Sequence, residues 1–131
     1  MCKDQKFLIC KHCGNLVGML HDAGVKIICC GEPMTQLVPN TTDAAQEKHV
    51  PVVSIQDNLV TVNVGSVSHP MEEKHHIAWI YLQTSQGGHR KCPPVDSKPE
   101  VTFALTEGEE AIAVFAYCNL HGLWKAQIAC E

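Results

Sequence analysis

Cysteine and histidine constrain this chain most, because each occurs eight times in 131 residues. A secreted chain with eight cysteines would be expected to use them for disulfides. Here the sequence begins with a charged segment, residues 1–6, and shows no long apolar stretch of a secretory signal, so we expect a cytoplasmic protein. In a reducing compartment, cysteines that occur in pairs with histidines nearby indicate metal binding instead.

Four of the cysteines follow the pattern C-x₂-C-x₁₅-C-C, which is formed by Cys10, Cys13, Cys29 and Cys30. Two thiolates separated by two residues can face one metal ion, and Gly14 allows the tight turn beneath them. The four sulfurs suit a structural zinc ion or an iron ion. A disulfide between Cys29 and Cys30 is another alternative, although a bridge between adjacent residues requires unfavourable geometry. The adjacent pair also predicts a distorted site, since neighbouring residues cannot both adopt the knuckle geometry.

The composition favours an all-β fold in two parts. Hydrophobic residues make up 45% of the chain, and valine and isoleucine are plentiful, which favours strands over helices. Residues 1–37 are predicted to form a small metal-binding domain with short strands at residues 6–10, 15–20 and 25–29. A segment of this size cannot build a sizeable core, so we expect a metal ion to stabilise it.

Residues 38–131 are predicted to form the second domain, an antiparallel β-sandwich. It opens with a linker, and Thr42 or Asp43 is expected to cap one turn of helix through residues 44–47. Short strands then follow one another without helices between them, at residues 50–55, 59–64, 77–82, 101–105, 111–117 and 123–128.

Alternation within these strands predicts which side chains share a face. Val60, Val62 and Val64 are expected together on one face, and Ile77 is expected on the same side as Trp79 and Tyr81. Residues 83–100 are rich in Gly, Pro, Ser and Lys and are predicted to form a long loop.

A second set of ligand-type residues lies at strand edges and in loops of the predicted sandwich, where such folds usually display function. It comprises His49, His69, His75 and the pair Cys118-x₂-His121. A lone histidine is more often a solvated or core residue than a ligand. Cys118-x₂-His121 is more specific, because it places two ligand types within reach of one metal ion.

The chain resembles two related kinds of iron protein. Its four-cysteine pattern is similar to the desulforedoxin-type site, which implies a single iron that passes one electron and has no open coordination position. The remainder closely resembles the desulfoferrodoxin family, the two-iron superoxide reductases. The matching strings are Asp-Ala-Ala-x-Glu-Lys-His-Val-Pro-Val at residues 43–52, His-Pro-Met-Glu-Glu-Lys-His at 69–75 and Tyr-Cys-Asn-x-His-Gly-x-Trp-Lys at 117–125.

This resemblance implies an immunoglobulin-like sandwich, a homodimer and a second iron. It implies that this iron is bound equatorially by His49, His69, His75 and His121, with Cys118 as the axial ligand. The implied reaction is the one-electron reduction of superoxide to hydrogen peroxide, with electrons from an external reduced donor such as rubredoxin. A thiolate opposite the open position would donate electron density along the axis, as an axial thiolate does in haem enzymes.

Glu47 and Lys48 have two interpretations each. From the residues alone, both are ordinary charged surface side chains. The resemblance implies that Lys48 steers superoxide and orders the water that supplies protons, and that Glu47 occupies the sixth position of the oxidised iron.

Some ligand-type residues have no place in either pattern, namely His12, His21, His76, His89 and the expected free thiols Cys2, Cys92 and Cys130. The net charge of −4, without a basic stripe, argues against a nucleic-acid partner. No apolar run approaches the length needed to cross a membrane. Superoxide dismutation, electron transfer without catalysis and a zinc-stabilised binding module are the alternative functions.

Overall fold

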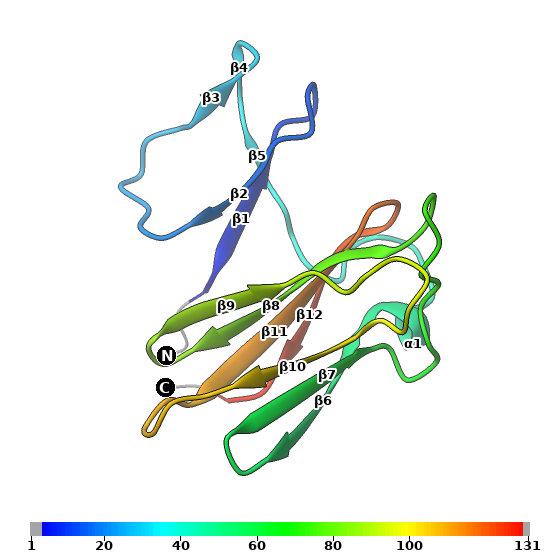
Figure 1. Ribbon diagram of the computed structural model, residues 1–131. Helices are drawn as coiled ribbons and strands as arrows, with labels where there is room; N and C mark the ends of the chain where they lie inside the picture. The colour runs from blue at the N-terminus through cyan, green and yellow to red at the C-terminus, as the bar shows by residue number, and fades with distance from the viewer. Residues whose placement is uncertain (1–3, 130–131) are drawn as a thin grey trace. The chain divides into compact units, whose positions relative to one another are not determined.

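The computed structural model describes residues 4–129, so Cys2 and Cys130 lie outside the described residues. The described chain divides into two compact units, with the division between Val38 and Pro39. Almost every regular element is a strand (Figure 1). The all-β prediction is therefore confirmed, and each unit is described here by itself.

The N-terminal unit is a small antiparallel sheet with a separate hairpin. The sheet has the order β2-β1-β5, and the hairpin pairs β3 with β4. Their bounds are β1 Lys6–Ile9, β2 Leu16–Met19, β3 Ile28–Cys29, β4 Glu32–Pro33 and β5 Thr35–Gln36. Among the described residues of this unit only Phe7 and Cys10 are buried.

The third strand predicted for this unit, at residues 25–29, is wrong in its length. Of these five residues, only Ile28 and Cys29 pair with another strand. The other three, residues 25–27, come directly after Gly24, which has a φ of +82°. Apolar side chains suggested a strand there, but backbone pairing begins only where β4 lies opposite.

The C-terminal unit is an antiparallel β-sandwich, as predicted. One sheet has the order β10-β7-β6 and the other β12-β11-β8-β9. The bounds are β6 Pro51–Gln56, β7 Leu59–Val64, β8 Ile77–Thr84, β9 Gly87–Lys91, β10 Glu100–Ala104, β11 Ala111–Cys118 and β12 Gly122–Gln127.

The core lies between these two sheets. Val60, Val62 and Val64 are fully buried, which confirms their shared inward face. Ile77 was expected on the side of Trp79, but it is fully buried and belongs to the core cluster. The reason is a register shift in the β8–β11 ladder, where Tyr117 pairs with Trp79 and the next residue pairs with Ile77. Such a shift changes the face to which the following side chain points.

The predicted long loop at residues 83–100 is wrong, because it contains strand β9. Ser85 and Gln86 form the turn of a hairpin, and β9 pairs with β8 from Thr84↔Gly87 to Ile80↔Lys91. Glycine and lysine are poor strand formers, but a ready partner strand overrides that preference.

The one predicted helix is present as α1, Gln46–His49, but its predicted cap is wrong. Ala45 occupies the N-cap position, and no side chain there accepts a hydrogen bond from the helix. The helix therefore begins later than Thr42 or Asp43 would allow. Within residues 4–129, no helix is long and apolar enough to span a membrane.

Candidate metal centres

Five side chains from separate segments converge at one end of the sandwich. His49 ends α1, His69 and His75 lie in the segment between β7 and β8, Cys118 ends β11, and His121 lies in the turn before β12 (Figure 1). Each offers one potential ligand atom, and these atoms all lie within 4.8 Å of one another. Segments up to 72 residues apart in sequence therefore meet at this cluster, here called the histidine cluster.

The four imidazoles of the histidine cluster form a closed ring of neighbours. Ring centroids are 4.7 Å apart for His49 and His69, 4.7 Å for His69 and His75, 5.1 Å for His75 and His121, and 5.0 Å for His121 and His49. Each neighbouring pair meets edge to face, at 73° to 86°. Four rings in this arrangement can direct one nitrogen each toward a common centre, with the Cys118 sulfur as a fifth donor.

Main-chain carbonyls determine which nitrogen is left for that centre. Nδ1 of His49 donates to the carbonyl oxygen of Ala45 (2.7 Å), and Nδ1 of His69 donates to that of Pro70 (2.7 Å). Nε2 of His69 and Nε2 of His75 are buried and have no hydrogen-bond partner among the described residues. Fixing one ring nitrogen on a carbonyl is the usual way to hold the other toward a metal.

His121 presents the opposite nitrogen. Its Nδ1 lies 3.1 Å from Nε2 of His49 and 3.8 Å from Sγ of Cys118. The backbone N–H of His121 also donates to that sulfur (3.4 Å). Three Nε2 atoms and one Nδ1 atom therefore surround the centre.

Trp124 supports this cluster, and sequence reasoning gave it no role. Its indole stacks on the His49 ring, with centroids 4.8 Å apart, and Nε1 donates to the carbonyl oxygen of His121 (3.1 Å). The only available signal was its place in the string at residues 117–125. Trp124 therefore packs against the ring of one ligand residue and holds the main chain of another.

Burial favours the neutral form of three of these histidines, His49, His69 and His75. It lowers the pKa of His49 and of His75, and it lowers the pKa of His69 to about 4. The charge of Lys48 lowers the pKa of His49 and His75 further. Buried polar atoms without a partner are costly, and neutral imidazoles with free lone pairs beside a thiol are the donors that iron and similar ions accept. The residues present therefore fit a metal ion.

Glu47 and Lys48 lie in α1 with exposed side chains and are not part of the five-residue cluster. Their backbone is tightly packed: the N–H of Val67 donates to the carbonyl oxygen of Glu47 (2.9 Å). A Cβ atom on Gly65 would come within 2.4 Å of the same oxygen. This close approach fixes the turn that carries both charges beside His49.

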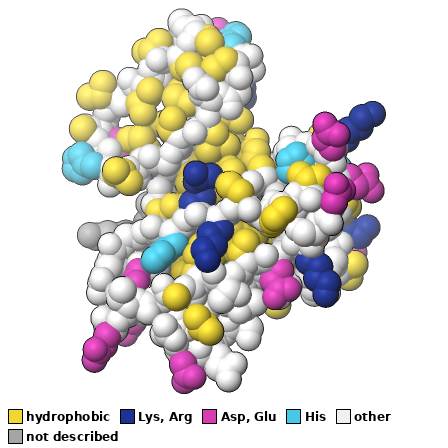
Figure 2. All heavy atoms as spheres, in the orientation of Figure 1, with side chains coloured by type: hydrophobic (Ala, Val, Ile, Leu, Met, Phe, Trp, Pro, Cys, Tyr) yellow, Lys and Arg dark blue, Asp and Glu magenta, His cyan; other side chains and the backbone are white. Residues whose placement is uncertain are grey.

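The surface at this end of the sandwich carries both signs of charge. Figure 2 shows basic and acidic side chains interspersed there. Of the described histidines outside the cluster, His12 pairs with Glu32 and His89 with Glu109. Cys92 is exposed, and Nη1 of Arg90 donates to its sulfur (3.1 Å).

The N-terminal unit brings Cys10, Cys13, Cys29 and Cys30 together, with their sulfurs within 4.8 Å of one another. All four are free thiols, so the alternative of a Cys29–Cys30 disulfide is wrong. Adjacent side chains of a strand point to opposite faces. Cys30 avoids this by adopting a φ of +52°, and Gly31 follows with a φ of +77°. The strained backbone lets both sulfurs face the same centre.

The four thiols cannot all ionise unaided. The backbone N–H of Cys13 lowers the pKa of Cys10 to about 6, whereas hydrogen bonds with Cys13 and Cys10 raise the pKa of Cys30 to about 12. These hydrogen bonds therefore favour the thiolate of Cys10 and oppose that of Cys30, and the charge of Cys10 opposes it further. A bound cation removes this opposition, so the four sulfurs also fit a metal ion.

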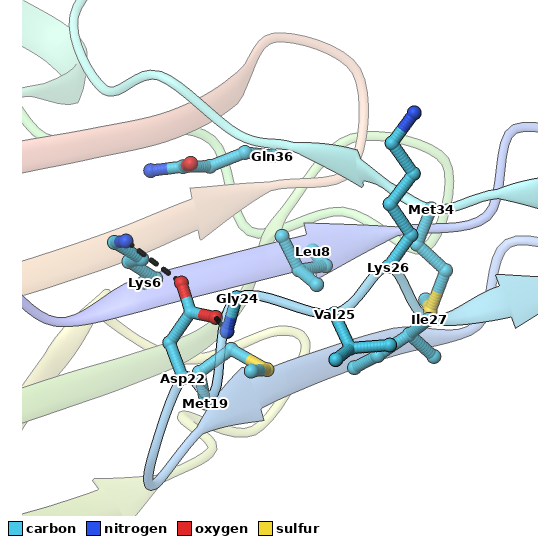
Figure 3. A pocket seen from close by; sticks show the side chains of 10 residues that line it. All are labelled: Lys6, Leu8, Met19, Asp22, Gly24, Val25, Lys26, Ile27, Met34 and Gln36. Carbon is cyan, nitrogen blue, oxygen red and sulfur yellow. Dashed lines mark hydrogen bonds and ion pairs between the residues drawn. The ribbon is translucent and has the colours of Figure 1, made fainter.

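A hollow on the N-terminal unit lies apart from its cysteines. Figure 3 shows apolar side chains lining it, with an ion pair between Lys6 and Asp22 (2.9 Å) at its rim. None of the four cysteines lines this hollow. The hollow is therefore not part of the four-cysteine site.

Comparison with known proteins covers both units. Residues 41–127 match the family model described as desulfoferrodoxin, and residues 3–37 match the model of the desulfoferrodoxin N-terminal domain. The chain is 48% identical over 118 residues to a desulfoferrodoxin from Syntrophotalea carbinolica, covering 90% of this chain and 92% of that protein. It is 46% identical over 118 residues to a desulfoferrodoxin from Nitratidesulfovibrio vulgaris, again covering 90% of this chain and 92% of that protein.

A solved structure is similar over nearly the whole chain. The crystal structure of the superoxide reductase from Treponema pallidum superposes with a TM-score of 0.81 at 42% identity. The match covers 95% of this chain and 100% of that one. The two-part architecture is therefore shared with this reductase from end to end.

Proposed function

The chain belongs to the desulfoferrodoxin family, and on that premise we propose that it reduces superoxide to hydrogen peroxide at the histidine cluster. Two mononuclear iron sites, one with four cysteines and one with four histidines and a cysteine, are its cofactors. We assign the catalytic iron to His49, His69, His75, His121 and Cys118. We assign the other iron to the four cysteines of the N-terminal unit.

The observation that carries this proposal is the closed ring of four imidazoles with a buried cysteine sulfur beside it. Superoxide takes up one electron and two protons to become hydrogen peroxide. A bound ferrous ion supplies that electron. Neutral imidazoles and one thiolate compensate only one of its two positive charges, so the site attracts a small anion.

Cys118 tunes the site from its buried position. Its side chain is completely shielded from solvent, and the backbone N–H of His121 donates to its sulfur. A hydrogen bond of this kind moderates the electron density that the thiolate donates, which is how protein groups adjust sulfur ligands.

Lys48 and Glu47 act at the open side of the cluster. Lys48 steers superoxide and orders the water that supplies protons, and its influence on the pKa of His49 and His75 supports its closeness to the cluster. Glu47 would supply a carboxylate ligand to the oxidised ion once the product has left. Both lie on the one turn of helix that ends in His49.

Residues 1–37 act as a separate iron domain and residues 38–131 as the catalytic sandwich. The four-cysteine iron passes single electrons or stabilises its unit, and a reduced rubredoxin-like protein supplies the electrons. The protein is a homodimer in this proposal. A cytoplasmic location is supported by the six free thiols of the described residues.

Product analysis tests the proposal. Superoxide is added to the fully reduced iron protein with excess reductant, and hydrogen peroxide and oxygen are both quantified. We expect one peroxide for each superoxide consumed and no oxygen. Oxygen release in proportion to peroxide would show dismutation, while consumption no faster than in buffer would indicate an electron-transfer protein. A colourless oxidised protein would indicate the zinc module.

A further inference from the structure

Asn119 lies between Cys118 and His121 in the string at residues 117–125, and no role has been assigned to it. We infer that Asn119 is a positioning residue that holds His75 in the histidine cluster by clamping the main chain on both sides of it. This inference rests on the proposed ligand role of His75. Asn119 is not one of the five residues of the histidine cluster.

The clamp consists of three hydrogen bonds. Oδ1 of Asn119 accepts from the backbone N–H of His76 (2.9 Å), and Nδ2 donates to the carbonyl oxygen of Lys74 (2.9 Å). The backbone N–H of Asn119 donates to the carbonyl oxygen of His76 (3.2 Å). The carboxamide thus reaches the residue before His75 and the residue after it.

His75 needs such a clamp more than the other buried imidazoles do. Carbonyl oxygens of Ala45 and Pro70 orient the rings of His49 and His69. Within residues 4–129, no hydrogen bond orients the His75 ring. The direction of its Nε2 atom therefore depends on where its own backbone is held.

The turn that carries His75 follows Met71, which is buried in the core and accepts from the backbone N–H of Asp96. It precedes β8, and its local bonds are internal: Glu72 and His75 exchange N–H···O bonds of 2.9 and 3.1 Å. The His76 ring likewise bonds to carbonyl oxygens of Glu72 and Glu73. Asn119 joins this self-contained turn to the end of β11.

The position of Asn119 makes the clamp effective. It directly follows Cys118, the last residue of β11, which pairs with Ile77 at the start of β8. One carboxamide therefore fixes the distance between the cysteine ligand and the His75 turn. Replacing a partner that orients a ligand typically weakens metal binding by about 10- to 100-fold.

Metal release from three variants tests this inference. Iron is removed anaerobically from the full protein by a chelator, and loss from the two sites is followed separately by their absorption spectra. We expect Asn119→Ala to release iron from the histidine cluster about 10- to 100-fold faster than the parent. Release from the four-cysteine site serves as the internal reference and should not change.

Asn119→Asp keeps an acceptor for the backbone N–H of His76 but cannot donate to the carbonyl oxygen of Lys74. We therefore expect it to release iron at a rate between those of the parent and Asn119→Ala. Gln127→Ala is the matched control. Its amide donates to the carbonyl oxygens of Ile112 and Ala129 at the far end of β12, about 16 Å along the strand from Gly122. Gln127→Ala should lower the free energy of unfolding without accelerating the release of iron from the histidine cluster.

Cobalt(II) substitution adds a readout of coordination. The ligand-field spectrum of cobalt at the histidine cluster should change in Asn119→Ala and stay parental in Gln127→Ala. The inference would be overturned if folded Asn119→Ala and Asn119→Asp both released iron at the parental rate and gave the parental cobalt spectrum. It would also be overturned if Gln127→Ala accelerated iron release as much as Asn119→Ala does. His75→Ala separates the two proposals: if it too leaves iron release unchanged, the ligand assignment of His75 fails.

Discussion

At the scale of single residues, α1 carries the three proposed functions of Glu47, Lys48 and His49 on consecutive side chains. His49 is buried and directed into the cluster, whereas Glu47 and Lys48 point outward. The carbonyl oxygen of Glu47 accepts from the N–H of Val67, which holds this turn against the chain that follows β7. A buried ligand with two exposed charges beside it allows the charges to act on an incoming anion without displacing the ligand.

Replacing Lys48 should slow the attack on superoxide. In Lys48→Ala we expect the bimolecular rate constant at low salt to fall roughly tenfold and its dependence on ionic strength to flatten, because a steering charge acts through a screened field. Pulse radiolysis at several salt concentrations measures both. Lys26→Ala in the N-terminal unit makes the same change in net charge and should leave the rate near that of the parent. An unchanged rate in Lys48→Ala at low salt would rule out steering.

Glu47 is expected to appear in the spectrum of the oxidised protein. In Glu47→Ala the absorption band of the ferric histidine site should shift, and added anions should alter it more strongly, because the open position has lost its carboxylate. Titration with azide, followed by absorption, is the measurement. Glu107→Ala removes an exposed carboxylate from the turn before β11 and should give the parental response. Coincident spectra for Glu47→Ala and parent would mean that Glu47 does not ligate.

Cys118, His121 and the four paired cysteines could be predicted as candidate ligands from their spacing, which is a local property. His49, His69 and His75 were implied only by the resemblance of their strings to the family. What could not be predicted is which ring nitrogen faces the centre. That choice depends on the carbonyl oxygens of Ala45 and Pro70, whose positions are set by the folded turns. Stacking of Trp124 on His49 is likewise a tertiary contact without a local pattern.

At the scale of elements, alternating valines predicted β7 well, whereas β9 was missed. A buried valine strand carries its pattern in its own side chains, and Val60, Val62 and Val64 are fully shielded. Strand β9, Gly87–Lys91, owes its conformation to pairing with β8 and to a hydrogen bond with Glu109, which lies before β11. Nothing in the sequence of β9 indicates either of these partners.

Glu109 links three elements, and its contribution should depend on pH. It accepts hydrogen bonds from the Thr84 hydroxyl (2.6 Å) and from Nε2 of His89 (2.9 Å). These bonds, that from Thr84 first, lower the pKa of Glu109 from 4.5 to about 2. A lowered pKa in the folded state means that the stabilisation is complete above pH 4.5 and is lost as the pH falls toward 2.

Glu109→Gln should therefore lower the free energy of unfolding by about 1 kcal/mol at neutral pH. The difference from the parent should shrink as the pH falls below about 4. Denaturant unfolding of both proteins at a series of pH values measures that difference. Glu107→Gln on the same turn is the control and should show no such trend. A difference that stays constant down to pH 3 would contradict the assignment.

At the scale of the whole molecule, the two units are stabilised by different means. The sandwich has a continuous core that includes Ile80, Leu82 and Phe103. In the N-terminal unit only Phe7 and Cys10 are buried among the described residues. A unit with so little buried apolar surface depends on its metal.

Cys13→Ser should consequently affect one unit and spare the other. We expect the backbone amides of residues 4–38 to lose protection against hydrogen exchange, because the four-sulfur site is broken. Amides of β7, β8 and β11 should keep their protection. Superoxide reduction that persists in this variant with an artificial reductant would show that the N-terminal iron mainly stabilises its unit. Equal loss of protection in both units would contradict their independence.

The central claim is that His49, His69, His75, His121 and Cys118 hold one iron ion. Anomalous diffraction at the iron edge, from crystals of the iron-loaded protein, tests it most directly. We expect one iron peak bonded to these four imidazoles and this sulfur, and a second peak among the four cysteines. An iron peak without Cys118 in its coordination sphere, or no peak at the histidine cluster, would contradict it.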